Sequence, residues 1–347
     1  MTIDAAPPPP ANRAATLVDV ARLSGVSKAT ASKALNGRDD VNPETRSRVL
    51  EAAEALSFRP NSVARNLVSG RTGTVGILTN DLEGRFVIPI LAGAEDALGS
   101  GQISVILCDA RGDRIRESQH LATLLDRRID GLIVVGGART EPRPSLGRSL
   151  PVPVVYAYAP SSDPGDTSLV TDNILGGRMA AEHLLDLGRR RIAYLGGNAT
   201  FLASREREQG ARAAIEAVDA ELILPEIAHG AWSEPWGRLA TTRLLERHPD
   251  LDAIIGAQDG LARAALDILR DHGRAVPGDV AVMGFDNWEI VVTNTRPELT
   301  SIDLMLQALG RRAASLIFEA LAGGTMPPGV EALPVELRAR ASTLGNG

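Results

Sequence analysis

The sequence of 347 residues predicts an α/β protein with a small helical head and a larger core. Two short helical runs, 17–23 and 27–35, are joined by a turn that contains Gly25, which is the pattern of a helix-turn-helix. From Thr74 onward, short apolar runs alternate with helix-like stretches, which favours parallel sheets with helices on both faces. The alternation occurs as two successive sets, so we expect two lobes, each with a doubly wound sheet.

The three helices expected in the head have recognisable start and stop signals. Thr16 followed by Asp19 resembles a capping box, with aspartate in place of the usual glutamate. Ser27 is a favourable N-cap for the second helix, and Asn36-Gly37 ends it, because glycine readily adopts the left-handed conformation of a helix exit. Asn42-Pro43 begins the third helix with a capping residue and a proline in the first turn. The apolar residues expected inside the head are Val20, Leu23, Val49, Ala52, Ala53 and Leu56.

The second helix, 27–35, has an unusually polar outer face for its length. Lys28 and Lys33 are the only lysines in the chain. They are separated by about 140° around the helix axis, so they can flank Ala29 and Ser32 at an edge that faces a DNA groove. Spacing alone favours DNA binding but leaves an ordinary amphipathic helix as the alternative.

Charge is distributed unevenly along the chain. Residues 1–71 contain ten lysine or arginine and seven aspartate or glutamate side chains, a net charge of +3, whereas the whole chain carries −6. The remaining residues, 72–347, therefore carry −9. A mildly basic head on an acidic body suits a protein whose head binds DNA and whose body stays away from phosphate.

Residues 61–71, between the head and the core, form either a short helix that ends at Gly70 or a plain linker. A helix of this length is not stable alone in water, because helix nucleation is costly. It would therefore need a partner to become ordered.

The core, residues 72–347, divides into a first lobe of about 72–171 and 302–347 and a second lobe of about 172–301. In doubly wound sheets, ligands bind beyond the carboxyl ends of the strands. Polar and aromatic residues follow several of the expected strands, and these side chains suit sugar hydroxyls or nucleobase edges, although any one of them could be an ordinary solvated loop residue. The expected strands are 75–78, 103–107, 131–135, 152–156, 191–195, 253–255 and 280–283. The candidate residues are Asn80, Asp81, Phe86, Tyr158, Arg205, Arg207, Trp232, Trp236, Gln258, Asp259, Asp286 and Asn287.

Several classes of protein are disfavoured. Cys108 is the only cysteine, so neither an internal disulfide nor a cysteine zinc site is available. The five histidines lack metal-ligand spacing, and no apolar run approaches the length of a membrane span. Residues 1–13 are rich in alanine and proline and lack a secretion signal, so we expect a disordered tail on a cytoplasmic protein. Because nucleotide-binding and nucleophile-elbow motifs are absent, we expect no cofactor and no enzyme activity.

The head resembles that of the lactose/galactose repressor family. The resemblance lies in the stretch 16–27, in Ala34-Leu35-Asn36-Gly37, in 41–46 and in 58–61. It implies that Lys28, Ala29 and Lys33 read base edges, although many members have arginine in place of Lys33. It also implies that 61–71 is a hinge helix that folds on DNA, with Leu67 as a wedge in the minor groove. The DNA-binding residues that we expect are Thr16, Ser27, Lys28, Ala29, Thr30, Ser32, Lys33, Asn36, Asn61, Ala64 and Leu67.

The resemblance continues more weakly through the core and implies a fold like that of periplasmic binding proteins, with an effector between the lobes. Three positions depart from the family pattern: Tyr158 replaces a frequent aspartate, Arg85 a usual proline, and Gln258 a usual asparagine. The effector-binding residues that we expect are Asn80, Asp81, Phe86, Tyr158, Arg207, Trp232, Gln258 and Asp286.

Together, these features predict a transcription regulator, most simply a repressor, that binds a pseudo-palindromic operator in double-stranded DNA as a homodimer. On its operator it would be associated with the nucleoid. A sugar-like or nucleoside-like effector would change the angle between the lobes, as an inducer or as a corepressor. Residues 331–347 show no leucine heptad, so no tetramer zipper is expected. A ligand-independent regulator, a solute-binding protein and an enzyme are the alternatives.

Overall fold

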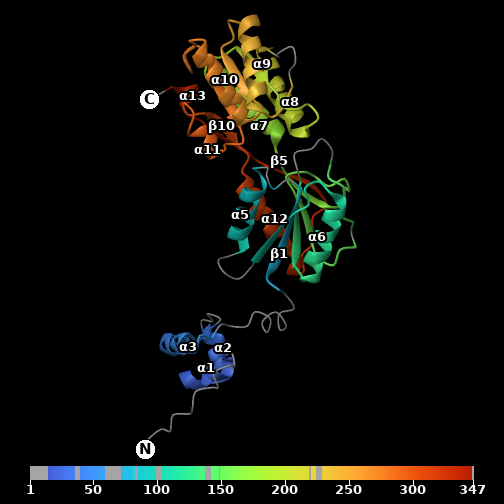
Figure 1. Ribbon diagram of the computed structural model, residues 1–347, viewed down its shortest axis with the longest axis vertical. Coiled ribbons are helices and arrows are strands. Elements are labelled where there is room, and N and C mark those ends of the chain that lie inside the picture. Colours follow the sequence, from blue (N-terminus) through green and yellow to red (C-terminus); the bar gives the residue numbers. More distant parts are fainter. Residues whose placement is uncertain are drawn as a thin grey trace, which may run out of the picture. The chain divides into compact units, whose positions relative to one another are not determined.

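The computed structural model describes residues 15–35, 40–58, 72–80, 82, 85–98, 104–136, 142–147, 149–218, 220–223 and 229–345. The chain forms two compact units, Met1–Thr72 and Gly73–Gly347, coloured blue and cyan-to-red respectively in Figure 1. The predicted fold class is confirmed, because a helical head precedes a core with two sheets. Within the described residues, no helix is long and apolar enough to cross a bilayer.

The head contains the three predicted helices, α1 (Leu17–Ser24), α2 (Lys28–Leu35) and α3 (Pro43–Ala55). Helix α1 begins with the predicted pairing of Thr16 and Asp19: the Thr16 backbone N–H donates to the Asp19 carboxylate at 2.9 Å. Gly25 follows with a φ of 68°, a left-handed conformation that costs glycine little. Helix α2 is capped by Ser27, and α3 by Asn42, whose side chain accepts from the Glu44 backbone N–H.

Small side chains fill the core of the head. Val20, Ala31, Ala34 and Val49 are buried at the contact of the three helices. The prediction for Leu23 is wrong, because its side chain is 57% exposed. Helix α1 buries Val20, Ala21 and Ser24 instead, and the Ser24 hydroxyl donates to the Val20 carbonyl oxygen at 2.7 Å.

The first lobe contains a six-stranded parallel sheet of order β11-β5-β4-β3-β1-β2. The four inner strands are buried along most of their length, as expected when helices cover both faces, whereas the edge strands β2 and β11 are half-buried or exposed. Helices α5 and α12 pack against each other on one face, and α6 lies on the other (Figure 1). The elements are β1 (Thr74–Thr79), α5 (Val87–Leu98), β2 (Ser104–Asp109), α6 (Arg114–Asp126), β3 (Gly131–Val135), β4 (Val154–Ala157), β5 (Thr167–Thr171), α12 (Leu306–Leu321) and β11 (Gly329–Leu333).

The second lobe contains a six-stranded sheet of order β12-β10-β9-β8-β6-β7, in which only β12 runs antiparallel to its neighbour. Helix α7 packs on α8, and α9 packs on α10. The elements are α7 (Asn173–Asp186), β6 (Arg191–Leu195), α8 (Leu202–Glu216), β7 (Glu221–Ile223), α9 (Glu234–Arg247), β8 (Ala253–Gly256), α10 (Asp259–Asp271), β9 (Ala281–Phe285), α11 (Glu289–Val292), β10 (Thr300–Asp303), β12 (Glu336–Arg338) and α13 (Ala341–Leu344).

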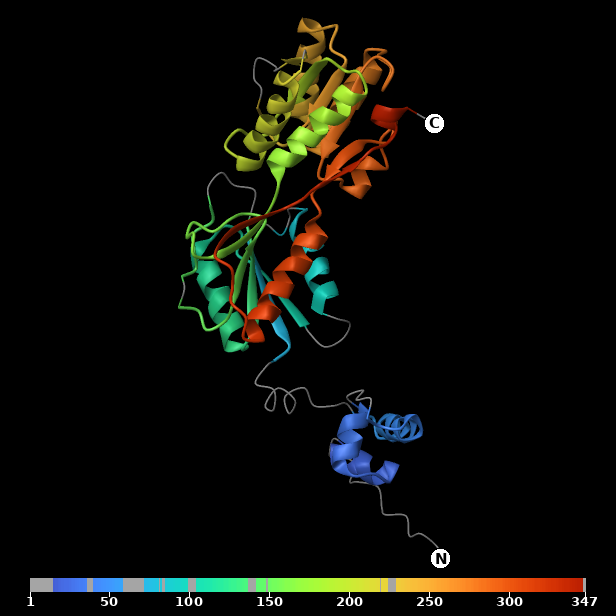
Figure 2. The same ribbon diagram turned by 180° about the vertical axis from the view of Figure 1, so that it is seen from behind.

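The chain passes between the lobes three times, at β5–α7, β10–α12 and β11–β12. Figure 2 shows the last passage as the red segment that runs from the first lobe to the second. The assignment of all of 302–347 to the first lobe is therefore wrong for β12 and α13. Val335 is buried in the core of the second lobe, and the Ser342 hydroxyl donates to the Val282 carbonyl oxygen of β9 at 2.6 Å.

Candidate DNA-reading head and effector cleft

Helix α2 presents the predicted DNA-reading side chains outward. Lys28, Ala29 and Lys33 are exposed, whereas Ala31 and Ala34 on the opposite face are buried in the head. This division follows from the helical period, because one face must pack against α1 and α3. Of the other predicted DNA-binding residues, Ser27 caps this helix and Thr30 and Ser32 lie on it, whereas Thr16 precedes α1; all four are exposed or half-buried.

The Lys33 ammonium group pairs with Asp40, with 2.5 Å between Nζ and a carboxylate oxygen. Both side chains are about half exposed, at 54% and 55%. Because such a pair is weak in water, Lys33 can leave Asp40 for a DNA acceptor. The predictions for Asn36, Asn61, Ala64 and Leu67, and for the hinge helix as a whole, lie outside the described residues.

In the core, the predicted effector residues lie where a ligand of a doubly wound fold binds. Asn80, Tyr158, Gln258 and Asp286 directly follow or closely follow the carboxyl ends of β1, β4, β8 and β9, where ligands of such sheets bind. Phe86 precedes α5, Arg207 lies on α8, and Trp232 precedes α9. The remaining predicted residue, Asp81, is not among the described residues.

Aromatic side chains connect the two lobes at this place. Phe86 and Tyr158 of the first lobe stack with ring centroids 4.5 Å apart, and both pack against the core of the second lobe. Tyr158 has a φ of 74°, a strained conformation for a residue with a Cβ, of the kind that accumulates at binding sites. The lobes are therefore in contact at the predicted cleft.

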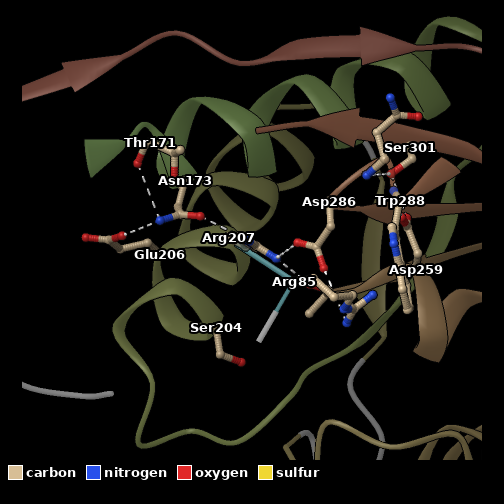
Figure 3. A network of polar contacts seen from close by, with 12 residues as sticks. Arg85, Thr171, Asn173, Ser204, Glu206, Arg207, Asp259, Asp286, Trp288 and Ser301 are labelled. Atoms are coloured by element: carbon tan, nitrogen blue, oxygen red, sulfur yellow. Dashed lines mark hydrogen bonds and ion pairs between the residues drawn. The ribbon is translucent and has the colours of Figure 1, made fainter. Parts of the chain in front are cut away.

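Arg207 is the centre of a buried polar network in the second lobe. Its Nε donates to Asn173 Oδ1 at 2.9 Å, and its Nη1 donates to the Ala257 carbonyl oxygen at 2.6 Å. The same Nη1 lies 3.3 Å from Asp286 Oδ1. Figure 3 shows this guanidinium group between Asn173 and Asp286. Arg207 thus ties the end of β9 to helices α7 and α8.

Asp286 also faces a cation from the first lobe. Arg85 Nη2 lies 3.8 Å from Asp286 Oδ2, and the Arg85 guanidinium carbon lies 4.3 Å from the centre of the Trp288 ring. Asp286 has a φ of 99° and Asn287 a φ of 49°, so the backbone is strained where the carboxylate turns into the cleft. Arg340 donates to the Asn287 side-chain oxygen at 2.7 Å and supports this turn.

Asp259 is a neighbour of Asp286 and is fully buried. Its carboxylate accepts from the Ser301 hydroxyl at 2.6 Å and from the Trp288 backbone N–H at 2.7 Å. Burial and the neighbouring Asp286 raise the pKa of Asp259 to about 8. Burial also raises the pKa of Asp286, against the lowering effect of Arg207 and Arg85.

Three of the predicted effector residues have buried polar atoms without a hydrogen-bond partner among the described residues: Asn80 Oδ1, Trp232 Nε1 and Asp286 Oδ2. Leaving such atoms unsatisfied costs free energy, so buried polar atoms of this kind indicate a ligand or water position. The Trp232 ring packs edge-on against Phe201 at 5.9 Å. In the same region, Trp236 has a partner, since its Nε1 donates to the Gly196 carbonyl oxygen.

The structure also shows where the choice of residues was incomplete. Gln258 has no side-chain hydrogen bond in the described network, whereas its neighbour Asp259 does. Trp288, Asn173 and Glu206 join the network but were absent from the predicted set. Position after a strand could have indicated Trp288; no such signal exists for Glu206, which lies on α8. Within the described part of the chain, no group of three histidine, cysteine or acidic residues could hold a metal ion.

Comparisons with known proteins agree with both parts of the chain. The family "Bacterial regulatory proteins, lacI family" matches residues 16–61, and a "Periplasmic binding protein-like domain" matches residues 181–343. The HTH-type transcriptional regulator CelR of Thermobifida fusca is 34% identical over 95% of this chain and 98% of its own length.

Solved structures give the same result. A transcriptional regulator CelR–cellobiose complex is 32% identical, covers 94% of this chain and 99% of its own, and has a TM-score of 0.64. The lac repressor dimer bound to operator and the anti-inducer ONPF is 26% identical, covers 96% of this chain and 100% of its own, and has a TM-score of 0.71. Because relatives match the head and the core together over almost their whole length, the chain belongs to the lacI family of bacterial regulatory proteins, which are DNA-binding transcription regulators.

Proposed function

We propose that this regulator is an operator-binding repressor whose affinity for DNA is set by a sugar in the cleft between the lobes. The observation that carries the proposal is the set of unpartnered buried atoms at Asn80, Trp232 and Asp286. Two of them are acceptors and one is a donor. A hydroxyl group both donates and accepts, so a ligand with several hydroxyl groups satisfies all three, and the aromatic faces of Phe86 and Trp232 cover its apolar side.

Cellobiose is the first effector to test. The CelR structure that covers nearly the whole of this chain is a cellobiose complex, and the three unpartnered atoms favour a sugar over a nucleobase. Tyr158 stacks on Phe86 at 4.5 Å, which leaves no room for a ring between them. We therefore place the sugar on the side of the cleft that holds Trp232 and Asp286.

On DNA, two copies of the chain would read a pseudo-palindrome, because the two-fold symmetry of a dimer is mirrored in its site. Lys28, Ala29 and Lys33 would contact base edges in the major groove, and Leu67 would enter the minor groove between the half-sites. The lac repressor in the matching structure is a dimer bound to operator, which supports this arrangement.

The sugar acts as inducer if it binds better to the lobe arrangement that weakens DNA binding, and DNA then weakens sugar binding by the same factor. A corepressor is the case of opposite sign. We propose that the protein binds its ligand without chemical turnover, since its relatives are transcription regulators. Its place of action would be the cytoplasm and, on its operator, the nucleoid.

Selection of binding sites from a random DNA pool tests the proposal. The purified full chain is expected to enrich an inverted repeat, and a variant with Lys28 and Lys33 both changed to alanine is expected to enrich none. Repeating the selection with cellobiose then gives the sign of the response. Failure to enrich any sequence, with and without sugars, at both low and moderate salt, would contradict the proposal.

A further inference from the structure

Asp286 is held by two arginines that differ in how they are fixed. Arg207 belongs to the same lobe as Asp286 and is anchored by Asn173 and Ala257, so its contact does not depend on lobe closure. Arg85 comes from the first lobe, and its side-chain partners among the described residues, Asp286 and Trp288, both lie on the second lobe. The contact of Arg85 therefore exists only while the lobes are closed.

The distance between Arg85 and Asp286 suits a ligand atom that bridges the two side chains. At 3.8 Å, Arg85 Nη2 is beyond hydrogen-bond reach of Asp286 Oδ2, which is buried and has no hydrogen bond of its own. A single oxygen atom can therefore lie about 2.8 Å from both Arg85 Nη2 and Asp286 Oδ2, which is a normal hydrogen-bond distance to each. A hydroxyl group in that position donates to the carboxylate and accepts from the guanidinium group.

The Trp288 ring gives Arg85 a second point of attachment. The guanidinium carbon lies 4.3 Å from the ring centre, within the range of a cation–π contact. The Trp288 side chain is 42% exposed even with Arg85 above it, so loss of Arg85 would expose more of the indole.

We propose that Arg85 is a cross-cleft latch, which holds the lobes closed through Asp286 and Trp288 and which, with Asp286 Oδ2, binds one hydroxyl group of the effector. The first half of this statement is independent of the proposed function, and the second half rests on it. The residue type at position 85 adds to the inference. The family pattern has a proline there, which offers no charge and no hydrogen-bond donor, whereas this chain has an arginine.

Acrylamide quenching of tryptophan fluorescence in the full chain tests the latch without any ligand. Arg85→Ala is expected to raise the quenching constant, because the closed-to-open ratio falls by roughly two- to fivefold when a partly exposed ion pair is lost. In the wild type, the constant should rise between about 0.1 M and about 1 M salt, where the Debye length falls from about 10 to about 3 Å. In Arg85→Ala, salt should have little effect.

Two variants control this experiment. Arg274→Ala removes an arginine of similar exposure, 26% against 23% for Arg85, which pairs with Asp279 within the second lobe. It should leave the quenching unchanged. In a Trp288→Phe background, Arg85→Ala should still raise the quenching constant, because opening of the lobes also exposes Trp232 in the cleft; simple uncovering of the Trp288 ring would give no rise there. Equal quenching of the wild type and Arg85→Ala, or equal salt dependence, would overturn the latch.

Cellobiose binding by calorimetry tests the hydroxyl position. Arg85→Ala is expected to weaken binding, and Arg85→Lys to weaken it less, because lysine keeps the charge but not the planar fork. If Arg85→Ala binds cellobiose as tightly as the wild type, Arg85 does not hold the sugar. If the wild type itself binds no cellobiose while the quenching results hold, the proposed ligand is wrong and the latch stands.

Discussion

Arg207 and Asp286 form an ion pair with 3.3 Å between Nη1 and Oδ1, and both side chains are almost completely buried, at 3% and 6% exposed. A buried pair of this kind is expensive to break, because removal of one partner leaves the other charged and unpaired. The same guanidinium group satisfies Asn173 and Ala257. Through Nε and Nη1, Arg207 therefore supports the cleft and fixes the position of Asp286.

Arg207→Ala is expected to lower the free energy of unfolding of the core by about 3–5 kcal/mol, measured by chemical denaturation of the full chain. Arg207→Lys should lose less, because it keeps a cation beside Asp286 but cannot also reach Asn173 and Ala257. Arg205→Ala, on the exposed side of the same helix, should stay within about 0.5 kcal/mol of the wild type. Wild-type stability in Arg207→Ala would show that the pair is not important for the fold.

Asp259 predicts a pH dependence of stability. Its pKa is raised to about 8 in the folded chain, whereas an unfolded aspartate titrates near 4. Between these values the folded state holds a proton that the unfolded state releases, so this group makes stability fall as pH rises from about 4 to about 8. Asp259→Asn cannot titrate, and its amide can accept from Trp288 and donate to Ser301.

Relative to the wild type, Asp259→Asn should therefore gain stability as the pH rises from about 5 to about 8, with no further gain above about pH 9. Denaturation of both proteins at a series of pH values measures the difference, in which the contributions of the histidines cancel. Ser342→Ala, which removes a different buried hydroxyl contact in the second lobe, should lower stability by the same amount at every pH. A difference between Asp259→Asn and the wild type that does not vary with pH would refute the raised pKa.

The sequence predicts those parts of the fold in which neighbouring residues alone determine the burial or the hydrogen bonds seen in the structure. Residues 192–195 carry no charge because this part of β6 is buried on both faces, and Ser27 and Asn42 cap helices through contacts within three residues. The strand β12 escapes this logic. In β12 a single apolar residue, Leu337, lies between two charged ones, and the strand belongs to the second lobe because it pairs with β10 and because Val335 and Leu337 pack against a core built mostly from residues 180–304.

The cleft was predictable in place but not in its contacts. The sequence predicts Asn80, Tyr158 and Asp286 as cleft residues because they follow strands, and topology alone brings strand ends together. The pairing of Arg85 with Asp286 joins residues 201 positions apart and depends on how closely the lobes approach. No local sequence pattern predicts how closely these two residues approach each other.

Leu67→Gly is expected to weaken binding to the selected operator and to reduce the bend of the DNA, because a glycine cannot unstack a base step. Leu67 lies outside the described residues, and the expectation comes from the family pattern of the hinge. Binding assays and a bend-dependent mobility assay measure both effects. Val68→Gly, at the next position, serves as the matched control for chain flexibility. Equal loss in both variants would contradict a specific wedge.

Lys33 allows a direct test of the head. In the absence of DNA, its ammonium group pairs with Asp40 at 2.5 Å, so binding to a base edge must break this contact. Lys33→Ala should cost about 1–3 kcal/mol on the selected operator and much less on random DNA.

Asp40→Asn removes the competing carboxylate and a negative charge near the phosphates, so it should strengthen binding to both kinds of DNA. In a double-mutant cycle, the benefit of Asp40→Asn on the operator should shrink in the Lys33→Ala background, because part of that benefit is the release of Lys33. An equal benefit in both backgrounds would mean that Asp40 acts only through its general charge, and equal losses of Lys33→Ala on operator and random DNA would reduce Lys33 to a phosphate contact.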